Sequence, residues 1–342
     1  MMKEIFILII AFIVIQSCNK ENMNQQDSFP YMVTATAPTE YPTEVHIGYF
    51  ADKNKKLICG VPKTGVSRDG WQYDGTEGGQ GGADVPYYFA LTYIAYAEKK
   101  FYTVETELPH DKILALFRKG YDRVDGSDMI VHENYTKLTV GMAPGGMIVL
   151  WLSGINNRVE ICRLQAKETF VDVNSFYDNP DKDNQETFFN EWFKIAVPDS
   201  IKSEISKSGL PIKKYENYRE RFQYRFVLNP YDEKDHFTHN YYLYFNGEAD
   251  ELLSNELNKN QYKEKGIPYD CTFMMTLYNV NIFFNDDEMY TVFSSFKKKY
   301  PNQPIDVIIT PLFNYDSFKV SVKCGNEEVL LSKFVVKSIT GG

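Results

Sequence analysis

The chain has 342 residues, of which 43% are hydrophobic and 24% are charged, so it is long enough for one large domain or two smaller ones and can bury a core. Its 46 acidic and 37 basic residues give a formal charge of −9, which argues against a large cationic surface and therefore against nucleic acid as a partner. An aromatic content of 15% argues against a disordered chain or a coiled coil. We expect a globular protein rich in β-strands.

The N-terminus has the pattern of an export signal. Residues 5–15 read IFILIIAFIVI, about half of the roughly 20 apolar residues that a membrane-spanning helix needs, which is the length of a signal-peptide core. The next residues, Ile15-Gln16-Ser17-Cys18, resemble the lipobox of bacterial lipoproteins, in which the cysteine receives the lipid. We predict a lipoprotein signal peptide at residues 1–17, lipidation of Cys18 and a polar tether at residues 18–30.

The predicted location of the protein is the cell envelope. Several acyl chains on one cysteine give stable membrane attachment, and no other segment of the sequence approaches membrane-spanning length. Asn19-Lys20-Glu21 resembles the Lys-acidic signal that some Bacteroidota lipoproteins use for surface export. We therefore expect a protein anchored by lipid to the outer membrane, on its periplasmic or its outer face. In that compartment, the remaining cysteines could form disulfides or stay as free buried thiols. They are Cys59, Cys162, Cys271 and Cys324.

Two stretches about 180 residues apart follow the same pattern. Residues 85–102 read VPYYFALTYIAYAEKKFY and residues 267–284 read IPYDCTFMMTLYNVNIFF, so that Pro86 aligns with Pro268 and Phe101 with Phe283 without a gap. Tyr and Phe at alternate positions, separated by short polar turns, predict two strands in each stretch. This agreement predicts an internal repeat.

A helix is predicted after each pair of strands. The first helix opens at Pro109 and carries Ile113 and Phe117 on one stripe. The second has capping-box spacing between Asn285 and Glu288, and its apolar stripe is formed by Met289, Val292, Phe293 and Phe296. One apolar stripe per helix predicts that one face of each helix packs on a sheet.

Further strands follow each helix. Residues 147–154, MIVLWLSG, are apolar on both faces, which is typical of a strand covered on both sides. Residues 318–324, FKVSVKC, alternate between apolar and polar residues, which predicts a half-exposed strand. Ala143-Pro144-Gly145-Gly146 is interpreted as a tight hairpin turn.

The predicted fold class is α+β, with two related ββαβββ units of mainly antiparallel sheet joined by a helical and hairpin linker region. The first unit is placed at residues 31–170, the linker at 171–265 and the second unit at 266–342. Within the linker, ETFFNEWFKIA and PDSIKSEISKSG predict helices, YRERFQYRFVL and HNYYLYFNGE predict a long hairpin, and Asn246-Gly247 is a turn candidate.

Residues 70–82, GWQYDGTEGGQGG, are the candidate ligand-binding segment. They contain six glycines together with Trp71, Tyr73, Asp74 and Glu77. One interpretation is a mobile loop whose aromatic rings stack on a sugar or peptide while its carboxylates accept hydrogen bonds. The alternative is a flexible surface loop without a ligand. A phosphate site is disfavoured because the segment has no phosphate-binding glycine motif and its carboxylates would repel phosphate.

No motif identifies a catalytic centre, a metal site or a cofactor. Residues 235–239, DHFTH, contain two histidines, but a strand would point them to opposite faces and zinc needs a third protein ligand. Nucleophile signatures are absent, although catalytic residues can converge from distant strands. If the protein were a hydrolase, paired carboxylates would form its centre, and Asp69, Asp74 and Asp84 would be the first to check.

Taken in order, the lipobox, the Trp71 segment, VPYYFALTYIAYAEKKFY, LPHDKILALFRKGYD and TVGMAPGGMIVLWLSG resemble the uncharacterised bacterial lipoprotein family that carries domain of unknown function 2931. The resemblance covers nearly the whole mature chain. The family has no established activity. Its members are sometimes encoded near secreted antibacterial effectors, which implies an immunity or partner-binding role.

The leading hypothesis is a lipid-anchored envelope protein that binds a macromolecule, with a protein as the expected partner, through its sheet edges or its aromatic loop and without catalysis; neutralisation of an effector is one form of it. The alternative is a periplasmic or surface hydrolase that acts on glycan or lipid. A purely structural component of the envelope is a third class. A deep pocket with convergent carboxylates would favour the enzyme, whereas a flat apolar patch would favour a binding surface.

Overall fold

The computed structural model describes residues 28–125, 129–177, 182–257 and 259–341. The predicted signal peptide, Cys18 and residues 19–27 of the predicted tether lie outside this part of the chain. The first strand begins at Ser28, so residues 28–30 belong to a strand rather than to a tether. No helix within the described ranges is long and apolar enough to cross a membrane.

Residues 28–170 form the first half of the molecule. Its elements are β1 (Ser28–Thr36), β2 (Thr43–Ala51), β3 (Leu57–Gly60), β4 (Val66–Ser67), β5 (Thr76–Asp84), β6 (Tyr88–Ala95), β7 (Lys100–Glu107), α2 (His110–Lys119), β8 (Tyr121–Val124), β9 (Ile130–Glu133), β10 (Lys137–Ala143), η1 (Pro144–Gly146), β11 (Met147–Gly154), β12 (Asn157–Gln165) and β13 (Lys167–Thr169).

Residues 222–341 form the second half, and helices connect the two halves. The connecting helices are α3 (Val173–Phe176), α4 (Gln185–Ala196), α5 (Asp199–Ser208) and α6 (Ile212–Asn217). The second half contains β14 (Phe222–Leu228), β15 (Phe237–Tyr244), β16 (Ala249–Leu252), α7 (Ser254–Leu257), β17 (Lys263–Lys265), β18 (Pro268–Met275), β19 (Tyr278–Phe284), α8 (Asp286–Lys299), β20 (Ile305–Leu312), η2 (Phe313–Tyr315), β21 (Ser317–Cys324), β22 (Glu327–Leu330) and β23 (Phe334–Gly341).

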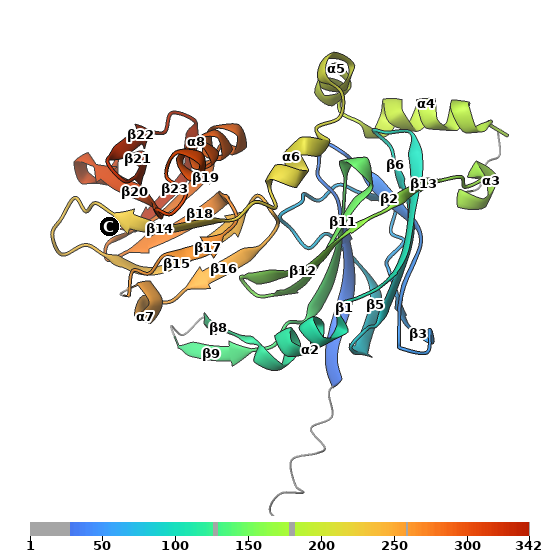
Figure 1. The fold of residues 1–342 in the computed structure, drawn as a ribbon, viewed down its shortest axis with the longest axis horizontal. Helices are drawn as coiled ribbons and strands as arrows, with labels where there is room; N and C mark the ends of the chain where they lie inside the picture. Colours follow the sequence, from blue (N-terminus) through green and yellow to red (C-terminus); the bar gives the residue numbers. More distant parts are fainter. Residues whose placement is uncertain (1–27, 126–128, 178–181, 258, 342) are drawn as a thin grey trace, which may run out of the picture.

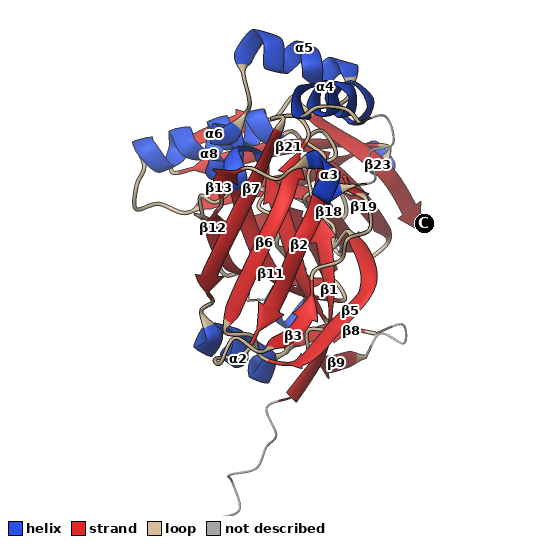
Figure 2. Ribbon diagram, turned by 90° about the vertical axis from the view of Figure 1, so that its right-hand side faces the viewer, coloured by secondary structure: helices blue, strands red, loops and turns tan. Residues whose placement is uncertain are grey.

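One long sheet runs through both halves, and each half adds a second sheet (Figure 1). The long sheet has ten strands in the order β23-β19-β18-β15-β16-β12-β11-β10-β1-β5. The first half adds a six-stranded sheet, β13-β7-β6-β2-β3 with β4 beside β2, and the second half adds a five-stranded sheet, β17-β14-β20-β21-β22. Neighbouring strands are mainly antiparallel, so the predicted mixed α+β class is confirmed. Figure 2 shows the strands of the first half with α4 and α5 at one end and α2 at the other.

The strand pairings follow one order in both halves. In the first half, β1 is parallel to β10 and antiparallel to β5, while β2, β6, β7 and β13 pair in succession. In the second half, β14 is parallel to β20 and antiparallel to β17, while β15, β18, β19 and β23 pair in succession.

The predicted hairpin of β14 and β15 does not form, because the two strands lie in different sheets. β14 pairs with β20, and β15 pairs with β16 and β18. The rings of Phe226 in β14 and Tyr242 in β15 pack with centroids 4.6 Å apart. Both strands have an apolar face. Because the two strands pack against each other between the sheets, these apolar faces are buried, which pairing in a hairpin alone would not achieve. Asn246-Gly247 forms the predicted turn, between β15 and β16, with Gly247 at a φ of 82°.

The local predictions for both helices are confirmed. α2 follows Pro109 and buries Ile113 and Phe117. α8 is capped by Asn285, whose side chain accepts a hydrogen bond from the backbone N–H of Glu288. Its buried residues are the predicted stripe of Met289, Val292, Phe293 and Phe296.

The other local predictions also hold. In β11, every residue from Met147 to Ser153 is buried, and the Pro144–Gly146 segment turns β10 into β11. In β21, Phe318, Val320 and Val322 are buried, whereas Lys319 and Lys323 are exposed. α4 and α5 occupy the two segments predicted as helices in the linker. Cys59, Cys162, Cys271 and Cys324 are all free thiols.

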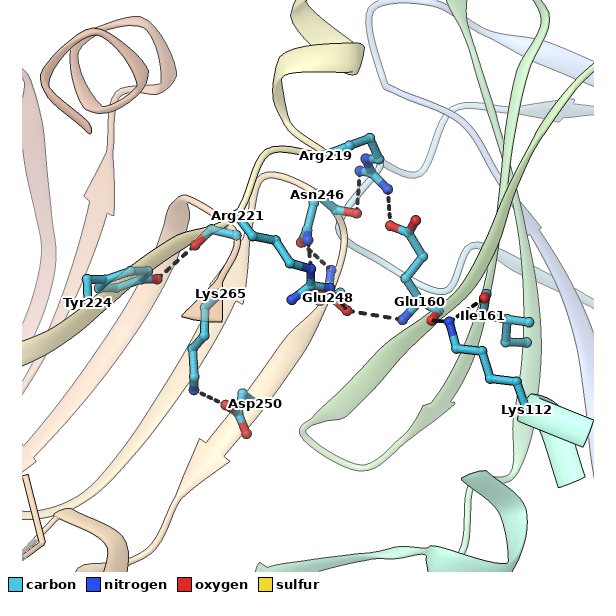
Figure 3. Close-up of polar contacts among 11 residues, drawn as sticks. Lys112, Glu160, Ile161, Arg219, Arg221, Tyr224, Asn246, Glu248, Asp250 and Lys265 are labelled. Atoms are coloured by element: carbon cyan, nitrogen blue, oxygen red, sulfur yellow. Dashed lines mark hydrogen bonds and ion pairs between the residues drawn. The ribbon is translucent and has the colours of Figure 1, made fainter. Parts of the chain in front are cut away.

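The two halves meet where β12 lies beside β16. A single residue pair, Arg158 with Ala249, joins these strands in the long sheet. Side chains reinforce the junction (Figure 3): Arg219 donates to the Glu160 carboxylate at 2.7 Å, and Arg221 donates to both oxygens of Glu248 at 2.6 and 2.7 Å. One continuous cluster of buried apolar residues contains side chains from both halves and from the connecting helices. The halves therefore share part of their core.

Candidate functional site

A cavity of about 450 Å³ opens where the first half, α6 and the second half meet. We call it the junction pocket. Its aromatic lining comes from all three parts of the chain: Tyr41, Trp71 and Tyr73 from the first half, Tyr215 and Tyr218 from α6 and the residue after it, and Phe245, Tyr269 and Phe284 from the second half. Its charged residues are Glu40, Glu204, Lys214 and Asp286. Aromatic walls with a few polar groups are typical of ligand sites.

Ring contacts connect these aromatic side chains into one row. Tyr41 meets the edge of Tyr215 at 6.2 Å between centroids, and Tyr215 meets Tyr218 at 5.5 Å. Tyr218 stacks on Phe245 at 5.2 Å, and Phe245 lies 5.0 Å from Tyr269. Such pairs contribute about 0.5–1.5 kcal/mol each beyond the area they bury. The row gives the pocket a wall that depends on both halves being in place.

α6 positions the central part of the wall. The helix begins after Pro211, which suits the start of a helix, and Tyr215 and Tyr218 are three residues apart, so both point to the same side. The Tyr218 hydroxyl donates to the Asp286 carboxylate at 2.6 Å, and Lys214 forms an ion pair with the same carboxylate. Burial opposes ionisation of Asp286, but its bonds to Lys214 and Tyr218 outweigh burial and hold its pKa below the usual range.

Two further acidic side chains of the pocket, Glu40 and Glu204, lie near Tyr41 and Tyr215. Both rings are buried, and Glu40 and Glu204 lie close enough to act on both hydroxyls. Burial, reinforced by Glu204 and Glu40, raises the pKa of Tyr41 to about 12. The same causes raise the pKa of Tyr215, so both hydroxyls keep their protons at neutral pH.

Two buried arginines lie behind the pocket wall. The Arg158 guanidinium packs 4.1 Å from the centre of the Trp151 ring, and Arg219 lies 5.3 Å from the centre of Trp71. Trp71 and Trp151 meet edge to face at 5.0 Å. Burial lowers the pKa of Arg158 to about 10, although Asp74 acts in the opposite direction, so the guanidinium stays charged at neutral pH. The indole nitrogens of both tryptophans have no hydrogen-bond partner within the described residues.

The structure divides the four predicted ligand-binding residues between two places. Trp71 and Tyr73 line the junction pocket, but Trp71 is only 2% exposed and cannot stack on a ligand as a free loop residue would, whereas Tyr73 is 46% exposed. Asp74 and Glu77 lie outside that lining and share Lys137, at 3.3 and 2.7 Å from its Nζ. The four residues therefore do not line one pocket.

The glycine-rich stretch is not the loop that the sequence analysis expected. Residues 76–84 form β5, which pairs antiparallel with β1. Gly75, just before the strand, has a φ of 76°, and a Cβ there would collide with the Ala35 carbonyl oxygen. The absence of a side chain at Gly75 therefore allows the chain to pass close to β1 before pairing begins. Backbone hydrogen bonds to β1 hold this strand despite its weak intrinsic strand propensity.

The carboxylates considered for a hydrolase do not converge on the pocket. Asp69 accepts a hydrogen bond from Thr76 at 3.0 Å, Asp74 belongs to the Lys137 group, and the exposed Asp84 ends β5. None of the three is part of the junction-pocket lining. In the described part of the chain, no three His, Cys, Asp or Glu residues are grouped to hold a metal ion.

The DHFTH segment is partly buried. Asp235 accepts a hydrogen bond from the Thr276 N–H at 2.9 Å, and His239 pairs with Glu251 at 2.6 Å. These contacts tie the start of β15 to its neighbours.

Sequence reasoning missed most of the pocket. Tyr41, Tyr215, Tyr218, Phe245 and Tyr269 are separated by up to 228 positions and converge only because the sheets bring the halves together. The one local signal is the spacing of Tyr215 and Tyr218 on a short helix. Read alone, that spacing is equally typical of a helix face packed on a core.

The fold and site define a mixed α+β protein, rich in antiparallel sheet, with an aromatic pocket at the junction of its two halves. The chain belongs to the family described as Protein of unknown function (DUF2931), whose model matches residues 18–213, more than half of its length. The match covers the first half and the connecting helices as far as α6. No curated protein and no solved structure matches the chain.

Proposed function

We propose that the protein is a lipid-anchored lipoprotein of the bacterial cell envelope that binds a partner at the junction pocket without catalysis. The observation that carries the proposal is the row of aromatic rings around a cavity of about 450 Å³, built jointly by both halves. The exposed Tyr73 and the half-buried Tyr269 offer aromatic contact area to a partner, and such area at low entropic cost is characteristic of binding surfaces.

The anchor is supported by the residues before the folded body. A signal-peptide core precedes Cys18, the family match begins at Cys18, and the first described strand begins ten residues later at Ser28. A tether of this length would hold the folded part of the protein near a membrane. We propose the outer membrane as its location. For the Cys18→Ser variant we expect loss of membrane fractionation and of metabolic acyl labelling. A variant that is still labelled and membrane-bound would exclude this anchor.

The non-catalytic form of the proposal is supported by the state of the pocket's acidic groups. Asp286 is held by Lys214 and Tyr218, and the three carboxylates considered for a hydrolase lie outside the lining. A protein partner fits a wall that is aromatic and rimmed by charge. Neutralisation of a secreted effector is one form that this binding could take.

The internal repeat is also part of the proposal: each half is a copy of one two-sheet unit. Its support is the shared order of pairings, in which β1, β2, β6, β7, α2, β10 and β11 correspond to β14, β15, β18, β19, α8, β20 and β21. On this account, residues 222–265 belong to the second copy and not to a linker. An experimental structure in which β14 paired with β15, and not with β20, would contradict it.

Binding is tested by affinity capture from cells with the full-length protein tagged at its C-terminus. Tyr73 is the exposed ring of the pocket, so Tyr73→Ala removes contact area without opening the core. We expect this variant to lose most of the captured partner. Phe313→Ala, which removes an even more exposed ring from η2, is the matched control and should capture as well as the wild type. Equal capture by all three proteins would refute binding at this pocket.

A further inference from the structure

We propose that the junction pocket binds a basic group, an ammonium or guanidinium ion, beside the hydroxyls of Tyr41 and Tyr215 and the carboxylates of Glu40 and Glu204. This inference rests on the proposed function, because it names the ligand chemistry of the same pocket. Three observations carry it: the charge of the lining, the unpaired carboxylates and the unpartnered hydroxyls.

The lining carries three carboxylates and one ammonium group. Lys214 and Tyr218 together engage Asp286, so this carboxylate is already neutralised and hydrogen-bonded. The carboxylates of Glu40 and Glu204 make no hydrogen bond and no ion pair with any residue that the structure describes. With three carboxylates and one ammonium group, the lining carries a net charge of −2, so a cation there would be attracted.

Two hydroxyls without hydrogen-bond partners point to the same ligand. Tyr41 and Tyr215 are only 6% and 5% exposed, yet neither hydroxyl has a hydrogen-bond partner in the described part of the chain. Both lie near Glu40 and Glu204, so hydroxyls and carboxylates share one side of the pocket. A phenolic oxygen accepts hydrogen bonds, and an ammonium or guanidinium group offers three to five N–H donors. One such group could bond a hydroxyl and a carboxylate at the same time.

Other ligand classes fit the pocket less well. An anion would be repelled by Glu40 and Glu204. A metal ion lacks a third ligand, because the described residues contain no group of three metal-ligating side chains. A neutral sugar could stack on the exposed Tyr73 ring but would leave both carboxylates without a counter-charge.

The test is calorimetric titration of the full-length protein, in detergent at low salt, with capped tripeptides. The lysine peptide acetyl-Gly-Lys-Gly-amide is compared with its norleucine analogue, which keeps the alkyl chain and lacks the charge. We expect at least one of three basic probes to bind at least about tenfold more tightly than the norleucine peptide: the lysine peptide, the corresponding arginine peptide or the free amine cadaverine. This binding should weaken as the salt concentration rises. Binding of cadaverine alone indicates a free amine as the ligand, and binding of a peptide indicates a basic side chain of a partner.

The matched variants separate charge from fold. In the doubly substituted protein, Glu40→Gln with Glu204→Gln, we expect affinity for the basic probe to fall at least about tenfold, because both substitutions are at exposed positions and keep the side-chain shape. Glu328→Gln, an exposed carboxylate on β22, removes one charge elsewhere and should leave affinity unchanged.

Three results would overturn the inference: no binding of any basic probe, equal binding of the lysine and norleucine peptides, or wild-type affinity in the double variant. None of these results contradicts the proposed function, which is tested separately by partner capture. If partner capture still depends on Tyr73, the pocket binds through other chemistry; if capture is independent of Tyr73, the proposed function itself fails.

Discussion

At the scale of single residues, the buried charges at the junction are the most informative feature. Arg158 is 4% exposed, its Nε lies 3.9 Å from the Asp74 carboxylate, and its second terminal nitrogen has no partner within the described residues. Breaking a buried pair from one side leaves an uncompensated charge, whereas replacing the charge by an apolar side chain does not. The two ends of this pair should therefore respond differently to mutation.

We predict that Asp74→Asn lowers the free energy of unfolding by about 2 kcal/mol, because Arg158 would keep its charge without its ion-pair partner. Arg158→Met should change stability by less than about 1 kcal/mol, since the thioether can occupy the same place against Trp151. Urea denaturation measures both. Glu77→Gln is the control, because its pair with Lys137 is exposed and contributes less than about 1 kcal/mol. A larger loss for Arg158→Met than for Asp74→Asn would show that the arginine is a net stabiliser.

Trp71 shows what sequence cannot supply at this scale. Its neighbourhood of glycines and carboxylates is typical of an exposed loop, and only the contacts with Trp151 and Tyr215 reveal that it is a wall of the core. Those partners lie 80 and 144 positions away in the chain. The local pattern carries no information about them.

At the scale of elements, helix caps and turns could be read directly from the sequence. Asn285 caps α8, Pro109 precedes α2, and Asn246-Gly247 turns β15 into β16, because each of these depends on a few neighbouring residues. The partner of a strand is not local information. β14 and β15 follow one another with hairpin-like patterns, yet they lie in different sheets and face each other across the core of the second half.

Glu288 adds a contact of α8 that its capping-box spacing did not predict. Its carboxylate accepts hydrogen bonds from the N–H and hydroxyl of Ser332 and from the N–H of Lys333, at 2.7–2.9 Å, and so ties α8 to the turn before β23. Burial opposes ionisation, but these bonds outweigh it and lower the pKa of Glu288. A carboxyl group whose pKa is lower in the folded state stabilises the fold above its unfolded pKa, and this contribution is lost as pH falls through the folded pKa.

We predict that Glu288→Gln lowers the free energy of unfolding by about 1–2 kcal/mol at pH 6, from the loss of charge-assisted hydrogen bonds. The difference from the wild type should shrink on acidification below about pH 4.3, the unperturbed pKa of Glu, because the wild-type carboxyl then becomes neutral as well. Urea denaturation at several pH values measures this. Glu328→Gln should show no such difference at any pH. A Glu288→Gln difference that persisted at pH 2.5 would contradict the proposed role of the charge.

At the scale of the whole molecule, side chains and the shared core hold the two halves together far more than the backbone does. Only one residue pair joins β12 to β16, whereas Arg219, Arg221, Glu160, Glu248 and Asn246 form a connected polar group across the junction (Figure 3). The junction pocket exists only while this contact is intact. Its integrity is therefore a property of the whole chain.

We predict that the wild-type protein unfolds in urea with coincident midpoints by tryptophan fluorescence and by far-UV circular dichroism. Trp71 and Trp151, two of the three tryptophans, lie at the junction, and the shared core couples the halves. In Glu160→Gln, Arg219 loses its carboxylate, so the fluorescence midpoint should fall below the dichroism midpoint. Glu105→Gln, in an exposed ion pair of β7, should keep the midpoints together. Separate midpoints in the wild type would mean that the halves unfold independently.

The central claim is that a partner contacts the protein at the junction pocket. The most direct measurement is site-specific photocrosslinking in cells, with p-benzoylphenylalanine placed at Tyr73 in the pocket or at Phe313 on η2, both of which are exposed. We predict a discrete crosslinked product from the Tyr73 position and none of the same mass from the Phe313 position. The same product from both positions, or from neither, would contradict binding at the junction pocket.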